Sequence, residues 1–195
     1  YQAVQLSGQG PMPAAEIKRA LDEAGLVCCA THDSIPRFSE HIEELVADHK
    51  LWGCKYPAIG GFFPKDPPPS AEVYADFAKR FDAIGAKLAA QGMLFSYHNH
   101  NHEFARFGGK TVMEILMENS RPENFAMEID THWVVRGGGD PAAWVARCAK
   151  RGPMPLLHLK DMLVNPVDKA PLFAEIGEGN LNWPAIFAAA KAAGV

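Results

Sequence analysis

The sequence predicts an α/β fold, specifically an incomplete (β/α)8 barrel of about six βα units. Short apolar runs alternate with amphipathic helical stretches, and the ends of successive runs recur roughly every 30 residues, the length of a βαβ unit. Polar and titratable side chains gather where the apolar runs end. This order is typical of a parallel sheet with right-handed crossovers, and we treat residues 1–195 as a single domain.

The expected strands are the short apolar runs. The run LVCCAT, residues 26–31, is continuously apolar, as in a strand that is buried on both faces. In chain order, the expected strands are residues 3–6, 26–31, 54–59, 93–98, 125–130 and 156–159.

The expected helices lie between these runs. In the first, Ile17 and Leu21 recur at helical spacing and Gly25 closes the helix. In chain order, the expected helices are residues 13–24, a stretch after Ser39 that ends at Gly53, and residues 71–90, 111–119, 140–150 and 183–193. His41 and His49 belong to the second helix, where we expect both side chains to face solvent.

The alternation fits a (β/α)8 barrel or an open doubly wound sheet. No G-x-G-x-x-G follows the first strand and no P-loop occurs, which argues against the nucleotide-binding doubly wound fold. Six units are two fewer than a closed barrel needs. The chain starts at Tyr1 and stops at a Gly194-Val195 pair typical of a helix end, so we expect a barrel fragment whose first and last strands are missing.

Composition excludes several classes of protein. A net charge of -4, from 19 Lys+Arg and 23 Asp+Glu, argues against a nucleic-acid partner. No apolar run approaches the roughly 20 residues of a membrane span, and no signal peptide is visible. We expect a cytoplasmic protein, leaving open a homo-oligomer and an export signal lost before residue 1. The four cysteines lack C-x-x-C spacing and scaffold density, which indicates reduced thiols.

Titratable side chains lie at the ends of four of the expected strands or directly after them. They are His32 and Asp33, the run His98-Asn99-His100-Asn101-His102-Glu103, Glu128 with Asp130, and His158 with Lys160 and Asp161. Because the carboxyl ends of parallel strands meet at one mouth, where ligands bind, imidazoles and carboxylates from separate strands are expected to surround one divalent ion there. Of the alternating histidines in the 98–103 run, we expect only the first one or two to point inward.

Some of these residues also have purely structural interpretations. Asp130 can cap the turn that follows its strand, although a buried carboxylate without a cation or a donor is costly. Lys160 and Asp161 can form a plain ion pair at the rim of the mouth. Glu128 is two residues before Asp130 and therefore lies on the same face of the strand. Its side chain can point into the barrel or form a salt bridge below the site, so we leave Glu128 out of the predicted site.

Four segments together carry a family resemblance: YHNHNHEF, EIDTHWVVRGGGDPAAW, PLLHLKDM and IGEGNLNWPAI. The chain resembles the sugar phosphate isomerase/epimerase family of the xylose isomerase-like TIM-barrel superfamily, which also contains inosose dehydratases and apurinic-site endonucleases. The resemblance covers essentially the whole chain. Its motifs are specific for the superfamily rather than for one substrate, and they imply a TIM barrel of the xylose isomerase-like type.

The resemblance implies a metal site of Glu, Asp, His and Glu at the ends of four strands. Matched by motif, Asp130 and His158 are the Asp and the His. His98 stands where the first Glu is usual, which is a departure, and the last Glu would lie beyond Val195. The implied cofactor is therefore a divalent ion (Mn, Mg, Co or Zn) held by His98, Asp130 and His158.

The resemblance also implies roles for neighbouring residues. Glu103 and Lys160 are the expected catalytic residues, which bind the substrate or shuttle protons. His32 and His100 are expected to bind the substrate. Glu178, in the GEGNLNW loop, borders the implied site without an assigned role.

The implied function is a metal-dependent isomerase or epimerase acting on a sugar, sugar phosphate or keto-sugar, a small-molecule carbohydrate, by proton abstraction next to a carbonyl through an enediolate. A hydratase or dehydratase of a keto-sugar or inosose would use the same intermediate. An apurinic-site endonuclease needs a basic DNA-binding face, against which the net charge counts. An inactive fragment is the remaining alternative, because a six-stranded piece leaves two sheet edges unpaired.

Overall fold

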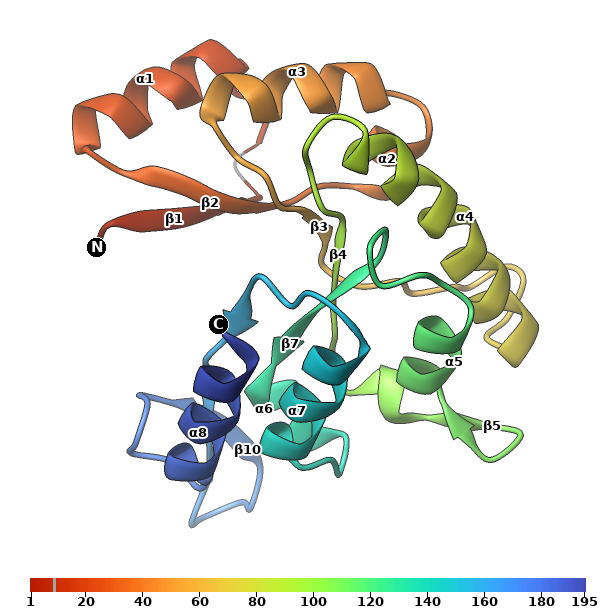
Figure 1. Ribbon diagram of the computed structural model, residues 1–195. Coiled ribbons are helices and arrows are strands. Elements are labelled where there is room, and N and C mark those ends of the chain that lie inside the picture. The colour runs from red at the N-terminus through yellow and green to blue at the C-terminus, as the bar shows by residue number, and fades with distance from the viewer. Residues whose placement is uncertain (9) are drawn as a thin grey trace.

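The computed structural model describes residues 1–8 and 10–195. Its framework is a curled parallel sheet of six strands in the order β1-β2-β3-β4-β7-β8, with the helices along its convex side (Figure 1). These strands are β1 Ala3–Ser7, β2 Val27–His32, β3 Pro57–Ile59, β4 Ser96–His98, β7 Ala126–Asp130 and β8 Leu157–His158. The βα alternation and the incomplete barrel predicted from the sequence are confirmed.

Helices connect successive strands of the sheet. They are α1 Ala14–Ala24, α2 Ile35–Ser39, α3 Ile42–Trp52, α4 Ala71–Ala89, α5 Val112–Glu118, α6 Thr131–Arg136, α7 Pro141–Arg151 and α8 Trp183–Ala193. The six predicted helices are present within a few residues of their expected bounds. The sequence prediction missed α2, α6 and the 3-10 turn η1 His102–Phe104, since each is too short for a periodic pattern. Across the described residues, every helix falls short of the length and apolarity that a membrane crossing requires.

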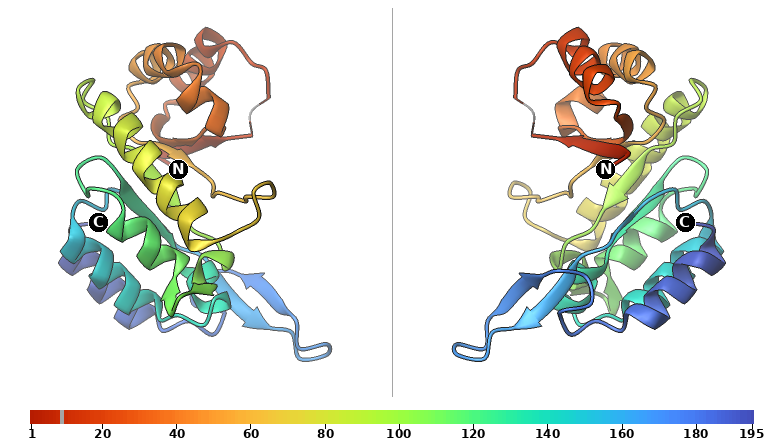
Figure 2. Two further views of the ribbon diagram at one scale, coloured as in Figure 1. Left: turned by 90° about the vertical axis from the view of Figure 1, so that its right-hand side faces the viewer. Right: turned by 90° about the vertical axis from the view of Figure 1, so that its left-hand side faces the viewer.

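Two small hairpins lie outside the sheet, and the sequence prediction missed both. One joins β5 Arg106–Phe107 to β6 Lys110–Thr111. The other joins β9 Asp161–Val164 to β10 Pro171–Ala174 and projects from the body of the molecule (Figure 2). It follows β8 almost directly, so it begins beside the carboxyl end of the sheet.

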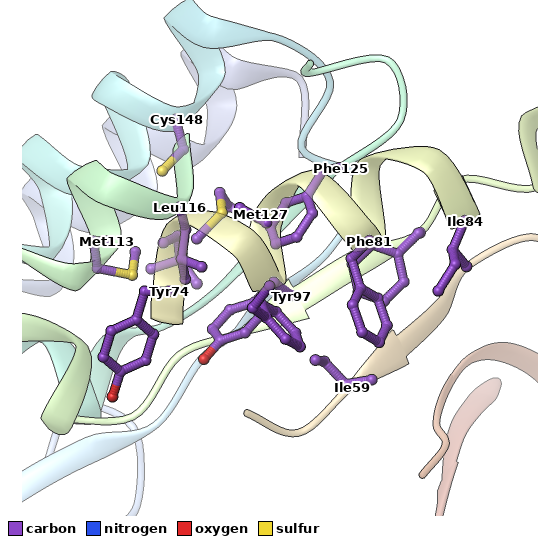
Figure 3. Packing of buried hydrophobic residues seen from close by; sticks show 14 of the residues in the cluster. Ile59, Tyr74, Phe81, Ile84, Tyr97, Met113, Leu116, Phe125, Met127 and Cys148 are labelled. Atoms are coloured by element: carbon purple, nitrogen blue, oxygen red, sulfur yellow. The ribbon is translucent and has the colours of Figure 1, made fainter. Parts of the chain in front are cut away.

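The main core lies between the sheet and the helices that cover it (Figure 3). Aromatic rings dominate it: Phe81 contacts Phe38 and Phe95 with centroid separations of 5.8 and 5.0 Å, and Tyr97 stacks on Phe125 at 5.8 Å. A smaller cluster under α1 and α3 contains the buried thiols of Cys28 and Cys54. All four cysteines are free, as the sequence predicts.

The strand pleat separates an apolar face from a polar one. In β7, Met127 and Ile129 pack in the core, whereas Glu128 and Asp130 face the concave side. All five residues of this strand are buried, so both carboxylates lie out of contact with bulk solvent. The period of two therefore gives the concave side its titratable groups.

A β-bulge in β2 decides where His32 points. Val4 pairs with Cys28 and Gln5 pairs with Ala30, so Cys29 is an extra residue without a partner on β1. An inserted residue reverses the alternation of the strand beyond it. Cys28 accordingly faces α1, while His32, four residues later, faces the concave side.

The same reversal turns Thr31 toward α3 and buries His49, so the prediction that His49 faces solvent is wrong. Its side chain is fully buried, with Nδ1 2.7 Å from the carbonyl oxygen of Leu45 and Nε2 2.8 Å from Thr31 Oγ1. Burial lowers the pKa of His49. His41, at the start of the same helix, is exposed as predicted.

A substitution at Gly85 would show how tightly α4 packs against the segment before β7. A Cβ atom at this helical position would lie 1.9 Å from the carbonyl oxygen of Asn124, before β7. Gly→Ala within a helix ordinarily stabilises by about 1 kcal/mol, but we expect Gly85→Ala to destabilise by about 1–3 kcal/mol through overpacking. Chemical denaturation measures this. Ala83→Gly, at an exposed position of α4, is the control and should cost only about 1 kcal/mol; a Gly85→Ala protein as stable as the wild type would contradict the packing argument.

Thr111 and Glu114 form a capping box at the start of α5. Its carboxylate accepts hydrogen bonds from Thr111 N–H at 2.7 Å and from Arg147 at 2.9 Å, and Thr111 Oγ1 accepts from Glu114 N–H. The Thr111 backbone hydrogen bond is the main cause that lowers the Glu114 pKa from 4.5 to about 2. Because the folded-state pKa is depressed, this contribution to stability is complete above pH 4.5 and is lost as the pH falls toward 2.

We therefore expect Glu114→Gln to cost about 1 kcal/mol at pH 7. We also expect its free energy of unfolding to fall less steeply than that of the wild type as the pH decreases from 4.5 to 2. Urea denaturation across this pH range measures both effects. Glu123→Gln, on an exposed turn, is the control and should follow the wild-type pH profile; an equally steep fall in Glu114→Gln would remove the assigned role of the cap.

Candidate functional site

An open cavity of about 850 Å³ lies at the carboxyl ends of the strands. Six of the seven residues predicted to form a site line it, namely His32, His98, His100, Asp130, His158 and Lys160. The seventh, Glu103, does not line the cavity. The strand ends thus bring together side chains that are far apart in the sequence, as expected for parallel strands.

The buried carboxylate of Glu128 lies beneath the floor of the cavity and collects donors from three other strands. Glu128 Oε1 lies 3.0 Å from Gln5 Nε2 and 3.3 Å from His32 Nε2, and it also contacts His158 Nε2. Burial by itself would raise the pKa of Glu128, but hydrogen bonds from His158 and His32 outweigh burial, so the pKa is lowered. Glu128 is therefore an ionised acceptor at the centre of the curled sheet.

The surroundings of His158 determine which of its nitrogens carries the proton. Nε2 has two acceptors as neighbours, Glu128 Oε1 and, at 2.5 Å, Gln5 Oε1. Nε2 therefore donates, so Nδ1 is the ring nitrogen that remains for a metal ion or another partner. Nδ1 lies 3.9 Å from Asp130 Oδ2, on the side of the ring that faces the cavity.

His98 lies between the same two carboxylates. Its Nε2 is 3.8 Å from Asp130 Oδ2, its Nδ1 is 3.9 Å from Glu128 Oε1, and its ring centroid is 4.5 Å from that of His158. Burial, followed by the nearby imidazole of His158, lowers the His98 pKa to about 2. The ring is therefore neutral at physiological pH, the form that ligates metals.

Two groupings of these side chains can hold a metal ion. On the cavity side, Asp130 Oδ2 lies 3.8 Å from His98 Nε2 and 3.9 Å from His158 Nδ1. Both distances are longer by about 0.5–0.6 Å than the separation of roughly 3.3 Å between two ligand atoms whose bonds to one tetrahedral ion are about 2.0–2.1 Å, so these side chains would have to move slightly inward to share an ion. On the deeper side, His32, His98, Glu128 and His158 each offer one ligand atom within 4.8 Å of the others. The buried His98 Nδ1 and Glu128 Oε2 have no hydrogen-bond partner among the described residues, so the deeper grouping keeps free ligand atoms.

Asp130 combines a structural contact with a free oxygen. Its Oδ1 accepts from the backbone N–H of Trp133 and so caps α6, which is the alternative that the sequence analysis left open. Asn99 Oδ1 accepts from the backbone N–H of Asp130, joining β4 to β7. Burial raises the pKa of Asp130, although the backbone hydrogen bond from Trp133 and the nearby charge of Lys160 act in the opposite direction.

Glu103 is fully buried behind His100. It accepts from Tyr97 Oη at 2.7 Å and from the backbone N–H of His100 at 2.8 Å, and His102 Nε2 lies 3.1 Å away. Burial raises the Glu103 pKa. Glu103 can therefore influence the cavity through His100, whereas its predicted catalytic role stays a prediction.

Lys160 and Asp161 do not form the ion pair that was one interpretation of the sequence. Asp161 is buried and faces the GEGNLNW loop, accepting from Trp183 Nε1 and from the backbone N–H groups of Gly177 and Gly179. Lys160 lines the cavity instead. Glu178 thus belongs to a loop that folds around Asp161.

Sequence reasoning missed two residues of this arrangement. The sequence shows that Glu128 and Asp130 lie on the same face of their strand. It does not show which of the two buried carboxylates accepts the hydrogen bonds of the imidazoles. No sequence pattern indicates a role for Gln5. Its contact with His158, 153 positions away in the sequence, arises only because the sheet curls.

The sequence matches the family model described as xylose isomerase-like TIM barrel over residues 1–195. A search of curated proteins found no match. The similar solved structures include a sugar phosphate isomerase/epimerase from Parabacteroides distasonis ATCC 8503, which is 22% identical with a TM-score of 0.81; the alignment covers 100% of this chain and 73% of that one.

Two other similar structures carry different descriptions. An AP endonuclease, family 2, from Brucella melitensis is 15% identical with a TM-score of 0.73, over 100% of this chain and 79% of that one. A probable 3-DHS dehydratase from Bacillus anthracis is 14% identical with a TM-score of 0.68, over 98% of this chain and 79% of that one. At these identities the likeness is one of fold.

Proposed function

Because the chain belongs to the xylose isomerase-like TIM barrel family, we propose that it is a metal-dependent isomerase or epimerase of a small carbohydrate. The observation that carries the proposal is the convergence of His98 Nε2, His158 Nδ1 and Asp130 Oδ2 at the cavity. Three protein ligands with an open position toward a cavity are typical of catalytic rather than structural metal sites.

Of the two groupings, we propose that the ion binds on the Asp130 side. Asp130 lines the cavity and Glu128 does not, and an ion that acts on a substrate must be open to it. Glu128 then acts as the outer carboxylate that holds His158 by its Nε2–H, a common support for metal-bound histidine. Two imidazoles with one carboxylate favour Zn, Co or Mn over Mg.

The bound ion would polarise a carbonyl and a neighbouring hydroxyl oxygen of the sugar, which lowers the barrier to enediolate formation by several kcal/mol. His100 lines the same cavity; its Nδ1 is buried without a hydrogen-bond partner among the described residues, so Nε2 is the nitrogen that we propose faces the substrate. Burial and nearby cationic groups lower its pKa to about 4, so above that pH its imidazole can accept a proton from the carbon next to the carbonyl. Glu103 orients His100 through its backbone N–H, and Lys160 binds the substrate.

The metal assignment predicts one ion per chain. We expect Asp130→Asn and His158→Ala to abolish stoichiometric binding, because each removes a ligand. We expect Glu128→Gln to weaken binding by about 10- to 100-fold, because it loosens the orientation of His158. Elemental analysis after dialysis and Co²⁺ titration followed by visible absorption measure these effects.

His41→Ala is the matched control, since this exposed histidine lies outside the cavity and should leave binding unchanged. Thermal melts of each variant verify folding. Full binding by both Asp130→Asn and His158→Ala would rule out this ligand set. Binding that survives in Asp130→Asn but vanishes in Glu128→Gln would move the ion to the deeper grouping.

The proposed reaction predicts solvent exchange at carbon. Metal-loaded protein incubated in D2O with a panel of ketopentoses and ketohexoses, free and phosphorylated, should give a product with deuterium at the carbon next to the carbonyl. We expect His100→Gln to lower the rate by about 10²- to 10⁴-fold without changing metal stoichiometry. Mass spectrometry with NMR locates the label.

His41→Ala should exchange at the wild-type rate. Equal exchange by His100→Gln and the wild type would disprove the role of His100. A product that has lost one water would replace the isomerase proposal with the dehydratase alternative. Absence of exchange with every sugar of the panel would count against sugar chemistry.

A further inference from the structure

Lys160 is a cation at the cavity without an anionic partner. No side-chain hydrogen bond or ion pair to its ammonium group occurs among the described residues. Its Nζ instead lies over two aromatic rings, 3.9 Å from the centroid of Phe173 and 5.0 Å from that of Trp133. Aromatic faces attract the charge but do not accept it as a carboxylate or phosphate does, so the ammonium keeps its capacity to bind an anion.

The nearby carboxylates of the chain are engaged elsewhere. Asp161, the next residue, faces the loop around Gly177 and Gly179. Asp130 caps α6 with one oxygen and presents the other to the imidazoles of His98 and His158. Neither carboxylate forms an ion pair with Lys160 among the described residues; the ion-pair contacts of Asp130 are with His98 and His158.

Hydrogen bonds hold the backbone at Lys160, and the aromatic rings under its ammonium group are packed in turn. Thr131 Oγ1 accepts from Lys160 N–H at 2.9 Å and lies 2.8 Å from the Lys160 carbonyl oxygen. Phe173 belongs to β10 of the projecting hairpin (Figure 2), and its ring packs against His132 at 4.7 Å. The lysine and its aromatic support are therefore organised before any ligand arrives.

A second unpaired cation lies beside the first. Arg136 Cζ lies 5.1 Å from the centroid of Trp133, and Arg136 has no carboxylate partner among residues 1–8 and 10–195. Two cationic side chains thus share one indole ring that lines the cavity. Two cations thus lie close together although the whole chain carries a net charge of -4.

We propose that Lys160, supported by Trp133 and Phe173, binds an anionic group of the substrate, so that the carbohydrate is a sugar phosphate or a sugar acid rather than a neutral sugar. This inference rests on the proposed function. The proposed metal ligands and Lys160 line the same cavity, so one bound sugar can meet both the ion and the ammonium group. A neutral sugar would leave this cation unpaired, whereas a phosphate or a carboxylate forms a charge-assisted hydrogen bond with it.

Calorimetric binding to the metal-loaded protein tests the proposal without requiring turnover. The probes are D-ribulose, D-ribulose 5-phosphate and D-fructuronate, which offer a ketose without an anion, with a phosphate and with a carboxylate. We expect at least one acidic probe to bind about tenfold or more tightly than ribulose. This preference should shrink as KCl rises, because salt screens charges at an open cavity. The tighter acidic probe identifies the anion.

The variant Lys160→Met should bring the affinity ratio of acidic to neutral probe close to one. Lys150→Met, which removes an exposed lysine from α7, should keep the wild-type ratio. Equal affinity of the wild type for all three probes, or a preference that persists in Lys160→Met, would overturn the anion site.

The two proposals can fail separately. A Lys160-dependent preference without deuterium exchange would keep the anion site and reject the proposed reaction. Exchange of ribulose without any preference for acidic probes would keep the reaction and reject the anion site. Thermal melts with and without metal establish that Lys160→Met is folded in either case.

Discussion

The burial of one charged group, the carboxylate of Glu128, constrains the concave side of this molecule. A buried carboxylate is stable only when donors surround it, and here the donors come from β1, β2 and β8 through Gln5, His32 and His158. These strands include both edges of the six-stranded sheet. Satisfying Glu128 therefore joins the two edges across the curl, in addition to the core on the convex side.

This arrangement also gives the candidate site its chemistry. Because Glu128 accepts a hydrogen bond from His158 Nε2–H, the other nitrogen of that ring faces Asp130 and the cavity. The bulge at Cys29 contributes in the same way, since it directs His32 toward Glu128 rather than toward the helices. Backbone irregularities beside functional sites often re-aim side chains in this manner.

Charge is distributed unevenly over the molecule, and this bears on the substrate. The proposed ligands include a single carboxylate beside two imidazoles, so a bound divalent ion would retain net positive charge. Lys160 and Arg136 stand nearby without carboxylate partners among the described residues. The net charge of -4 therefore describes the surface as a whole and not the cavity, because local fields depend on placement.

The sequence by itself determined the succession of strands and helices and the positions where polar residues end the strands. The period of two in AMEID and the helical spacing between strands are local patterns, and the common direction of parallel strands brings their ends to one cavity. Six of the seven residues predicted to form the site line this cavity. The family resemblance added the roles.

Only the tertiary structure decided which partners each side chain meets. Local patterns in the sequence do not predict the bulge at Cys29, the burial of His49 against Thr31, or the contact between Gln5 and His158. Lys160 and Asp161 are neighbours in sequence, yet one lines the cavity and the other holds a loop. Such partnerships depend on the curl of the sheet and on competition for hydrogen-bond donors, which act between residues distant in sequence.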